Sequence, residues 1–372
     1  MTSIPDDAPE FMRAALSLAA RGLGSVWPNP AVGCVIVKNG SVVGRGWTQP
    51  GGRPHAETEA LKRAGVEARG STAHVTLEPC SHTGQTGPCA DALIAAGVAC
   101  VVGAMEDPDP RVSGRGYAKL ETAGIRVVRD RLADAARALN AGFILRTIEQ
   151  RPLFTLKTAT TLDGRIATAT GDSQWITSEA ARAAGQLLRL QHDAIMVGSN
   201  TALADDPTLT MRVSGASLDP RRPRIVVDGR LRLSPSSRLV QTLSAAPLWI
   251  VTQIGHASHL KAPLMEAGVT LIEVHSQGEV GGVDIAATAR ALAERGLTRV
   301  LVEGGGRLSA SLLRADFVDR IAWFRAPSIA GGDGLPAIAG LGVQTVSDLF
   351  GFERLSTAHW GSDSLEILAR KR

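Results

Sequence analysis

The sequence lacks any long hydrophobic run. No apolar stretch in its 372 residues approaches the roughly 20 residues that a helix needs to cross a bilayer. The opening residues, MTSIPDDAPE, also lack the basic start and the following apolar run of a secretion signal. We therefore expect a cytoplasmic protein without a membrane partner.

Cysteine is also scarce, with four residues in the whole chain. In the reducing cytoplasm so few cysteines do not form a disulfide framework, so each is predicted to be buried or to bind a metal. Cys34 and Cys100 lie within apolar runs, which favours burial. Cys80 and Cys89 instead each follow a proline, and they are the candidate metal ligands.

Aromatic residues make up only 4% of the chain, and lysine is rare, with six residues against 34 arginines. The 40 basic residues are mixed with 36 acidic ones and form no run, although the net charge is +4. A groove for single-stranded nucleic acid needs basic and aromatic side chains together. These counts argue against a nucleic-acid-binding or editing protein and favour small anionic ligands.

The composition and the length indicate two globular domains, since 44% of the residues are hydrophobic and 20% are charged. In residues 1–148 a helix is predicted from Pro9, and Asn39-Gly40 predicts a hairpin turn. Strands then alternate with helices, which predicts a sheet covered by helices on both faces. The polar stretch RTIEQRP, residues 146–152, breaks this pattern, so we place the domain boundary there.

Residues 149–372 predict a second α/β domain. Seven β-rich runs occur between Leu153 and Pro327, and the last of them is RIAWFRAP. Helical periodicity is clear over residues 178–190, 284–295 and 306–314.

A histidine, a glutamate and two cysteines form the strongest chemical pattern. His55 and Glu57 occupy the first turn of a predicted helix, and Cys80 follows the predicted strand HVTLE. Cys89 opens another predicted helix behind Pro88, a residue favoured in the first turn. The N–H groups and the dipole of a helix N-terminus stabilise the thiolate that zinc requires. Three ligands leave the fourth position for water, which is the pattern of catalytic zinc.

The glutamate indicates a reaction for this site. Zinc deaminases of nucleobases carry the pattern H-x-E with P-C-x-x-C, in which the glutamate transfers protons and does not bind the metal. The His-Ala-Glu triplet at 55–57 and Pro79-Cys80 match this pattern, but eight residues separate the two cysteines instead of two. Two other interpretations stay open: a buried cysteine pair with a capping glutamate, and a structural zinc for which His82 is the only nearby fourth ligand.

Eight ordered motifs connect the chain with one known family. The first domain contains PNPAVGCVIVKNG, PHAETEAL, VTLEPCSHTGQTGPC and DPDPRVSGRG, and the second contains TLDGRIAT, DSQWITS, LADDPTLTMR and VEGGGRLSASLL. On these motifs the chain resembles the bifunctional deaminase–reductases of riboflavin biosynthesis along nearly its whole length. The long spacing between the two cysteines is itself typical of that deaminase.

The resemblance implies a cytidine-deaminase-like three-layer α/β/α domain followed by a dihydrofolate-reductase-like α/β domain. The first would use one zinc ion to deaminate a small phosphorylated pyrimidine, 2,5-diamino-6-(5-phosphoribosylamino)pyrimidin-4(3H)-one. His55, Cys80 and Cys89 would bind the zinc and Glu57 would transfer protons. Asn29 would hold the pyrimidine, although on the residues alone it is equally a turn residue. The second domain would use NADPH to reduce the ribosyl chain to ribityl.

The resemblance also implies the binding residues of the second domain, which lacks a G-x-G-x-x-G fingerprint after its first strand. The glycines of VLVEGGGRLSASLL would form a phosphate cradle at a helix N-terminus, although such a run alone is often a plain turn. The implied cofactor contacts are Ala159, Trp175, Thr201, Asp205, Gly229, Gly305, Gly306, Arg307, Leu308, Ser309, Ala310 and Ser311. The implied substrate contacts are Lys157, Ser173, Arg189, Leu209, Arg212 and Glu303.

Two of these roles have a chemical reason. Arginine binds phosphate through two parallel hydrogen bonds, which suits Arg189 and Arg212, although without the motif a surface ion pair would be the favoured role of each. Lys157 lies on the first strand of the domain, where we expect it to polarise the sugar carbon that accepts hydride.

Three positions depart from the family pattern. Thr48 stands where histidine is frequent, Gln85 where a basic residue is frequent, and Asp109 where asparagine is frequent. These departures concern recognition of the pyrimidine and the ribose phosphate, not the zinc chemistry. One other function stays open, a deaminase of free bases or nucleosides with a non-catalytic nucleotide-binding second domain. The sequence also leaves open a homo-oligomer and the basis of a preference for NADPH over NADH.

Overall fold

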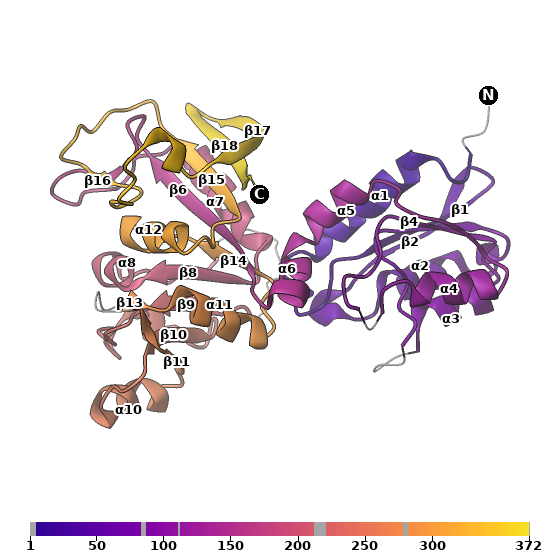
Figure 1. The fold of residues 1–372 in the computed structure, drawn as a ribbon, viewed down its shortest axis with the longest axis horizontal. Helices are drawn as coiled ribbons and strands as arrows, with labels where there is room; N and C mark the ends of the chain where they lie inside the picture. Colours follow the sequence, from indigo (N-terminus) through magenta and orange to yellow (C-terminus); the bar gives the residue numbers. More distant parts are fainter. Residues whose placement is uncertain (1–4, 83–86, 111, 212–220, 278–281, 372) are drawn as a thin grey trace. The chain divides into compact units, whose positions relative to one another are not determined.

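The computed structural model describes residues 5–82, 87–110, 112–211, 221–277 and 282–371. The chain divides into two units, Met1–Gln150 and Arg151–Arg372 (Figure 1). Gln85 and Arg212, two positions singled out from the sequence, lie outside the described residues. In the described ranges no helix has the length and apolar character needed to span a membrane.

The first unit is built on one five-stranded sheet. Its helices are α1 Pro9–Ala19, α2 Ala56–Ala64, α3 Cys89–Ala96, α4 Arg115–Thr122, α5 Ala133–Leu139 and α6 Ala141–Glu149. Its strands are β1 Gly33–Lys38, β2 Ser41–Trp47, β3 Thr72–Val75, β4 Cys100–Gly103 and β5 Arg126–Val128. The strand order is β2-β1-β3-β4-β5, in which β1 is antiparallel to both neighbours and β3, β4 and β5 run parallel.

The predicted hairpin is confirmed. Asn39 and Gly40 join β1 to β2 with φ angles of +51° and +75°, which is the left-handed conformation that a two-residue hairpin turn requires. Every residue of β3 and β4 is buried, so both faces of the sheet carry core. The stretch 146–152, predicted to interrupt the regular elements, is helical in its first part, because Arg146 to Glu149 belong to α6 and Gln150 is the C-cap residue of that helix.

Two glycines of β2 determine where α2 lies. A Cβ atom at Gly44 would collide with the carbonyl oxygen of Ala60, and one at Gly46 with that of Ala56. Because glycine has no Cβ atom, the backbone of α2 can pack directly on the strand. The N-terminus of α2, where His55 is the capping residue, is therefore held firmly against the sheet.

The second unit is built on a nine-stranded sheet. Its helices are α7 Glu179–Leu190, α8 Ser199–Asp205, α9 Arg238–Gln241, α10 Ser258–Glu266, α11 Ile285–Glu294 and α12 Gly306–Arg314. Its strands up to β11 are β6 Leu153–Thr160, β7 Arg165–Ala167, β8 Ala194–Gly198, β9 Arg224–Val227, β10 Leu248–Gln253 and β11 Thr270–Val274. The later strands are β12 Ser276–Gln277, β13 Gly282–Val283, β14 Arg299–Val302, β15 Arg320–Arg325, β16 Leu335–Pro336, β17 Phe352–Trp360 and β18 Asp363–Arg370.

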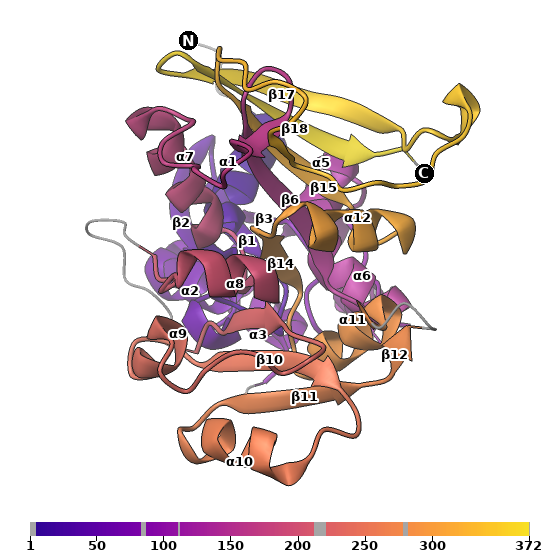
Figure 2. The ribbon, with the colours of Figure 1, turned by 90° about the vertical axis from the view of Figure 1, so that its left-hand side faces the viewer.

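The order of the large sheet is β11-β10-β9-β8-β14-β6-β15-β18-β17. The strands from β11 to β15 run parallel, and β18 and β17 then continue the sheet antiparallel. Figure 2 shows the yellow β17–β18 ribbon at the edge opposite β10 and β11. The neighbouring strands β8 and β14 lead at their carboxyl ends into α8 and α12, which is where open parallel sheets bind ligands.

Candidate active sites

Three candidate ligand atoms converge in the first unit. Nδ1 of His55 lies 3.3 Å from Sγ of Cys89 and 3.7 Å from Sγ of Cys80. The three atoms lie within 4.8 Å of one another, and among the described residues no other group of histidine, cysteine and acidic side chains is placed to hold a metal. His82, the candidate fourth ligand of a structural zinc, is not in this group and is exposed.

The helix N-termini position these atoms. His55 caps α2, and Cys89 is the first residue of α3. The backbone N–H of Cys89 donates a hydrogen bond to Sγ of Cys80 at 3.3 Å. The carbonyl oxygen of Cys80 accepts the N–H of Ala90 at 3.1 Å. Cys80 is thereby fixed at the start of α3, where the N–H groups of the helix stabilise a thiolate.

The electrostatics of the group favour metal binding. The hydrogen bond from the Cys89 thiol, with further help from His55, lowers the pKa of Cys80 to about 4 against the opposing effect of burial. Sharing of that proton, together with burial, raises the pKa of Cys89. A cation that binds between these two sulfurs and the imidazole displaces the protons that they hold. One nitrogen and two sulfurs form a donor set that fits zinc.

Glu57 lies beside this group in the first turn of α2 and is only 4% exposed. Burial raises its pKa to about 7, with a smaller upward contribution from Cys80 and an opposing one from His55. A carboxyl group with a pKa near the working pH both accepts and returns protons efficiently. Glu57 therefore fits the role of proton carrier and not that of a simple helix cap.

An open cavity of about 510 Å³ lies in the same unit and carries two of the residues singled out from the sequence. The side chain of Asn29 packs against Gly52, which has a φ angle of +85°. A Cβ atom at position 52 would collide with the Asn29 amide, so glycine is needed there. The lining residues are Pro28, Asn29, Asp109, Pro110, Phe143, Arg146 and Thr147.

Thr48, which stands where the family often has histidine, is only 3% exposed. Its hydroxyl accepts the backbone N–H of Val32 at 3.0 Å, and it is not among the residues that line the cavity. In the structure Thr48 therefore supports the chain before β1.

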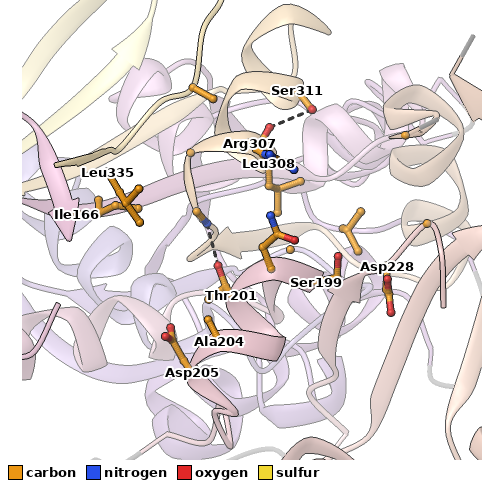
Figure 3. Close-up of a pocket in the computed structure, with 18 of the residues that line it drawn as sticks. Ile166, Ser199, Thr201, Ala204, Asp205, Asp228, Arg307, Leu308, Ser311 and Leu335 are labelled. Atoms are coloured by element: carbon orange, nitrogen blue, oxygen red, sulfur yellow. Dashed lines mark hydrogen bonds between the residues drawn. The ribbon is translucent and has the colours of Figure 1, made fainter. Parts of the chain in front are cut away.

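A cavity of about 640 Å³ lies between α8 and α12 in the second unit (Figure 3). Ser173, which we expected to contact the substrate, is one of the residues that line this cavity. Of the expected cofactor contacts, those that line it are Thr201, Asp205, Gly229, Gly305, Gly306, Arg307, Leu308 and Ser311.

The other four expected cofactor contacts do not line this cavity. Ser309 and Ala310 are 1% and 0% exposed, because they lie on the face of α12 that packs on the sheet. Trp175 is 68% exposed, and the guanidinium of Arg182 lies 4.5 Å from the centre of its ring. Ala159 packs against a small core beneath α7. Consecutive residues of one helix face different directions, so they cannot all place side chains on one ligand.

The N-terminus of α12 has the shape of a phosphate cradle. The N–H of Gly305 donates to Oγ1 of Thr201 at 3.1 Å, a bond drawn in Figure 3. A Cβ at Gly305 would meet only that hydroxyl, at 3.3 Å, whereas one at Gly306 would lie 2.6 Å from the carbonyl oxygen of Pro336. Glycine therefore keeps the backbone bare toward the cavity and lets the segment with Pro336 approach.

Positive side chains that sequence reasoning did not single out complete this cavity. Arg230 and Arg232 line it together with Arg307. Arg232 donates to Oγ of Ser199 at 2.7 Å and to Oδ1 of Asn200 at 3.0 Å. The sequence did offer a signal for these two residues, because Arg230 and Arg232 follow closely after β9, and β9 ends beside α8. A cavity with a bare helix N-terminus and three guanidinium groups fits a cofactor rich in phosphate, as NADPH is.

Arg189 and Glu303, expected to contact substrate, are joined by two hydrogen bonds of 2.7 and 2.9 Å. Burial opposes ionisation of Glu303, but the charge of Arg189, with help from Lys157, lowers its pKa to about 2. Leu209 and Arg189 line a separate cavity of about 150 Å³. Arg212 lies outside the described residues.

Two family descriptions match the chain. "Cytidine and deoxycytidylate deaminase zinc-binding region" matches residues 5–105, and "RibD C-terminal domain" matches residues 152–365. Riboflavin biosynthesis protein RibD of Escherichia coli strain K12 is 42% identical over 363 residues, which are 95% of this chain and 96% of that protein. RibD of Aquifex aeolicus strain VF5 is 40% identical over 97% of this chain and 98% of its own length.

Solved structures agree with these matches. Acinetobacter baumannii RibD, form 1, has a TM-score of 0.86 at 33% identity over 98% of this chain and 99% of its own. A diaminohydroxyphosphoribosylaminopyrimidine deaminase/5-amino-6-(5-phosphoribosylamino)uracil reductase from Thermotoga maritima has a TM-score of 0.83 at 34% identity over 98% of each chain. The expected fold class is confirmed, and a deaminase with a non-catalytic second domain is not favoured, because the similarity runs through both halves. The chain belongs to the RibD family, and it is a bifunctional riboflavin-biosynthesis enzyme with a zinc-dependent deaminase and an NADPH-dependent reductase.

Proposed function

We propose that residues 1–148 deaminate 2,5-diamino-6-(5-phosphoribosylamino)pyrimidin-4(3H)-one and that residues 149–372 reduce the ribosyl chain of the product to ribityl. The observation that carries the proposal is the convergence of His55, Cys80 and Cys89 beside the buried Glu57. A binding protein has no need of a buried carboxyl group beside three metal-ligand atoms, whereas hydrolysis at a ring carbon requires a proton carrier there.

In the deaminase, His55, Cys80 and Cys89 would hold the zinc ion. Zinc, when bound, supplies the Lewis acid that makes water a nucleophile at neutral pH. As the water oxygen bonds to the ring carbon, Glu57 carries the two protons of the water in turn, one to the ring nitrogen and one to the amino group, which leaves as ammonia. Asn29 orients the pyrimidine, since its amide offers both a donor and an acceptor to the ring edge.

In the reductase, Gly305, Gly306 and Arg307 would hold the phosphates of NADPH at the N-terminus of α12. NADPH, when bound, supplies the hydride. Lys157 polarises the sugar carbon that accepts it, and the bond from this carbon to the ring oxygen breaks as the oxygen takes up a proton. Arg189 binds the substrate phosphate together with Arg212, which lies outside the described residues. Glu303 orients Arg189 through the bidentate pair described above.

The cell compartment and the assembly also belong to this proposal. None of the four cysteines forms a disulfide, which supports a reducing, cytoplasmic location. We propose no nucleic-acid partner and no membrane partner, because basic and aromatic side chains do not gather in the sequence. A homo-oligomer is testable by light scattering at several protein concentrations.

One experiment tests both halves. The zinc-loaded protein is incubated with the diaminopyrimidine phosphate, with and without NADPH, and the products are identified by mass. Without NADPH we expect the product in which an amino group is replaced by oxygen, and with NADPH the same product with two added hydrogens. Turnover of cytosine, guanine or cytidine in place of this substrate, without NADPH binding, would contradict the proposal.

A further inference from the structure

Glu78 is a buried carboxylate that the steps above do not use. It lies between β3 and the zinc ligand Cys80, and it is only 3% exposed. Its two oxygens accept four backbone N–H groups at distances of 2.7 to 3.4 Å, from Asp107, Gly114, Gly116 and Tyr117. A charged acceptor makes these bonds stronger than their neutral equivalents, so Glu78 ties down a segment that follows it by about thirty residues in sequence.

The segment held by Glu78 forms a wall of the open cavity. The N–H of Asp109 donates to Oδ1 of Asp107 at 2.9 Å, and Asp109 lines the cavity. The same segment is pressed against the residue before Cys80, because a Cβ at Gly116 would collide with the carbonyl oxygen of Pro79. One carboxylate therefore connects the backbone that presents a metal ligand to the backbone that presents a cavity wall.

We propose that Glu78 is a positioning residue of the deaminase, which fixes the wall that carries Asp109 relative to the ligand segment at Cys80. The inference rests on the proposed deaminase function. Reactions at a preformed site are sensitive to distance, and a displacement of about 1 Å can cost about 10²-fold in rate. Loss of the carboxylate leaves buried N–H groups without an acceptor, and the wall then moves to find other partners.

The test compares Glu78→Gln with Glu106→Gln. The glutamine at position 78 keeps one acceptor oxygen but turns an NH₂ group toward two of the four N–H donors. Glu106 is the matched control, because it is exposed, precedes the same segment and pairs with Arg129 at 3.1 Å. For the full-length parent and both variants we would measure zinc per chain, deaminase kcat and KM, and NADPH-dependent reduction of substrate that has already been deaminated.

We expect Glu78→Gln to keep its zinc and its reductase rate while deaminase kcat/KM falls at least about tenfold, mainly through KM. Glu106→Gln should stay within about twofold of the parent. A deaminase KM within twofold of the parent in zinc-loaded Glu78→Gln overturns the proposal. A variant that loses only zinc also overturns the proposal, because Glu78 would then support only the zinc ligand Cys80.

A second variant keeps the test valid if Glu78→Gln does not fold. In Gly114→Ala the added Cβ would have no atom within 4 Å, so it causes no collision. Alanine is nevertheless strained at a φ angle of +75°, and this strain should weaken the hydrogen bond from the N–H of residue 114 to Glu78. It should raise deaminase KM with zinc retained, and an unchanged KM overturns the proposal. A parent protein that shows no deamination at all contradicts the proposed function instead, before any variant is compared.

Discussion

At the scale of single residues, Glu57 is the side chain whose replacement isolates the deamination chemistry. Glutamine keeps the shape of Glu57 but cannot carry protons. We expect Glu57→Gln to keep zinc and to lose deamination by roughly 10²- to 10⁴-fold, because general acid–base groups contribute that much. Reduction of the deaminated substrate should survive, as each half-reaction assayed separately will show. Equal loss of both activities would instead mean that Glu57 is structural.

The cysteine ligands can be tested at the same scale without any turnover. Serine in place of Cys80 or Cys89 removes a thiolate, and two remaining protein ligands hold zinc weakly. We expect each variant to contain much less than one zinc per chain by elemental analysis, while Cys34→Ser, which changes a buried thiol outside the ligand group, retains it. Full zinc in both ligand variants would remove these cysteines from the site.

The Arg189–Glu303 pair makes a prediction about pH. The folded-state pKa of Glu303, about 2, lies below its ordinary value of 4.5. Its contribution to the free energy of unfolding is therefore complete above about pH 4.5 and is lost as the pH falls toward 2. Glu303→Gln leaves a largely buried guanidinium without its partner, which should cost about 3 to 5 kcal/mol at neutral pH.

Chemical denaturation of the parent and of Glu303→Gln at several pH values measures this effect. The difference between the two proteins should be constant from pH 8 to 5 and shrink below pH 4, where the parent also loses the charge. A difference that grows on acidification would mean that the pair does not stabilise the fold.

Single residues also show the limits of sequence reasoning. His55, Cys80 and Cys89 could be found because each is marked by a local signal, a proline or a helix start. Glu78 could not, because its four partners lie far along the chain and only folding brings them to it. Arg232 was missed for a similar reason, since its partners Ser199 and Asn200 belong to another element.

At the scale of elements, the N-terminus of α12 makes the sharpest prediction. A Cβ at Gly305 would meet only Oγ1 of Thr201, at 3.3 Å, and the φ angle of −72° suits any residue, so we expect the fold to tolerate valine there. Its side chain would nevertheless occupy the place of the phosphates, and NADPH affinity should fall by at least tenfold in a fluorescence titration. Gly351→Val, immediately before β17 and away from the cavity lining, is the control. Unchanged affinity in a folded Gly305→Val protein would remove this loop from the cofactor site.

Elements with a strong apolar period were predictable, and exposed ones were not. The hairpin at Asn39-Gly40 and the helices near residues 178–190, 284–295 and 306–314 are confirmed. The strand β17 was not predicted, because its residues are nearly all exposed and show no alternation of apolar and polar side chains. Its pairing with β18, not its own composition, makes it a strand.

At the scale of the whole molecule, the two sites belong to different units, and among the residues that the structure describes the one group of histidine, cysteine and acidic side chains placed to hold a metal lies in the first unit. Removal of zinc with a chelator should therefore abolish deamination and leave NADPH-dependent reduction of deaminated substrate within about twofold. Added zinc should restore the first activity. A parallel loss of both, with the protein still folded by circular dichroism, would show that the reductase depends on the metal.

The exposed strand β17 has a consequence for the molecule as a whole. A strand at the end of a sheet carries unpaired N–H and C=O groups along one side, and such a row invites strands of other chains to add to it. Here the row is interrupted by a bulge between Arg354 and Ser356, and charged side chains at Glu353 and Arg354 flank it. The bulge and these charges are features that oppose the addition of a strand from another chain.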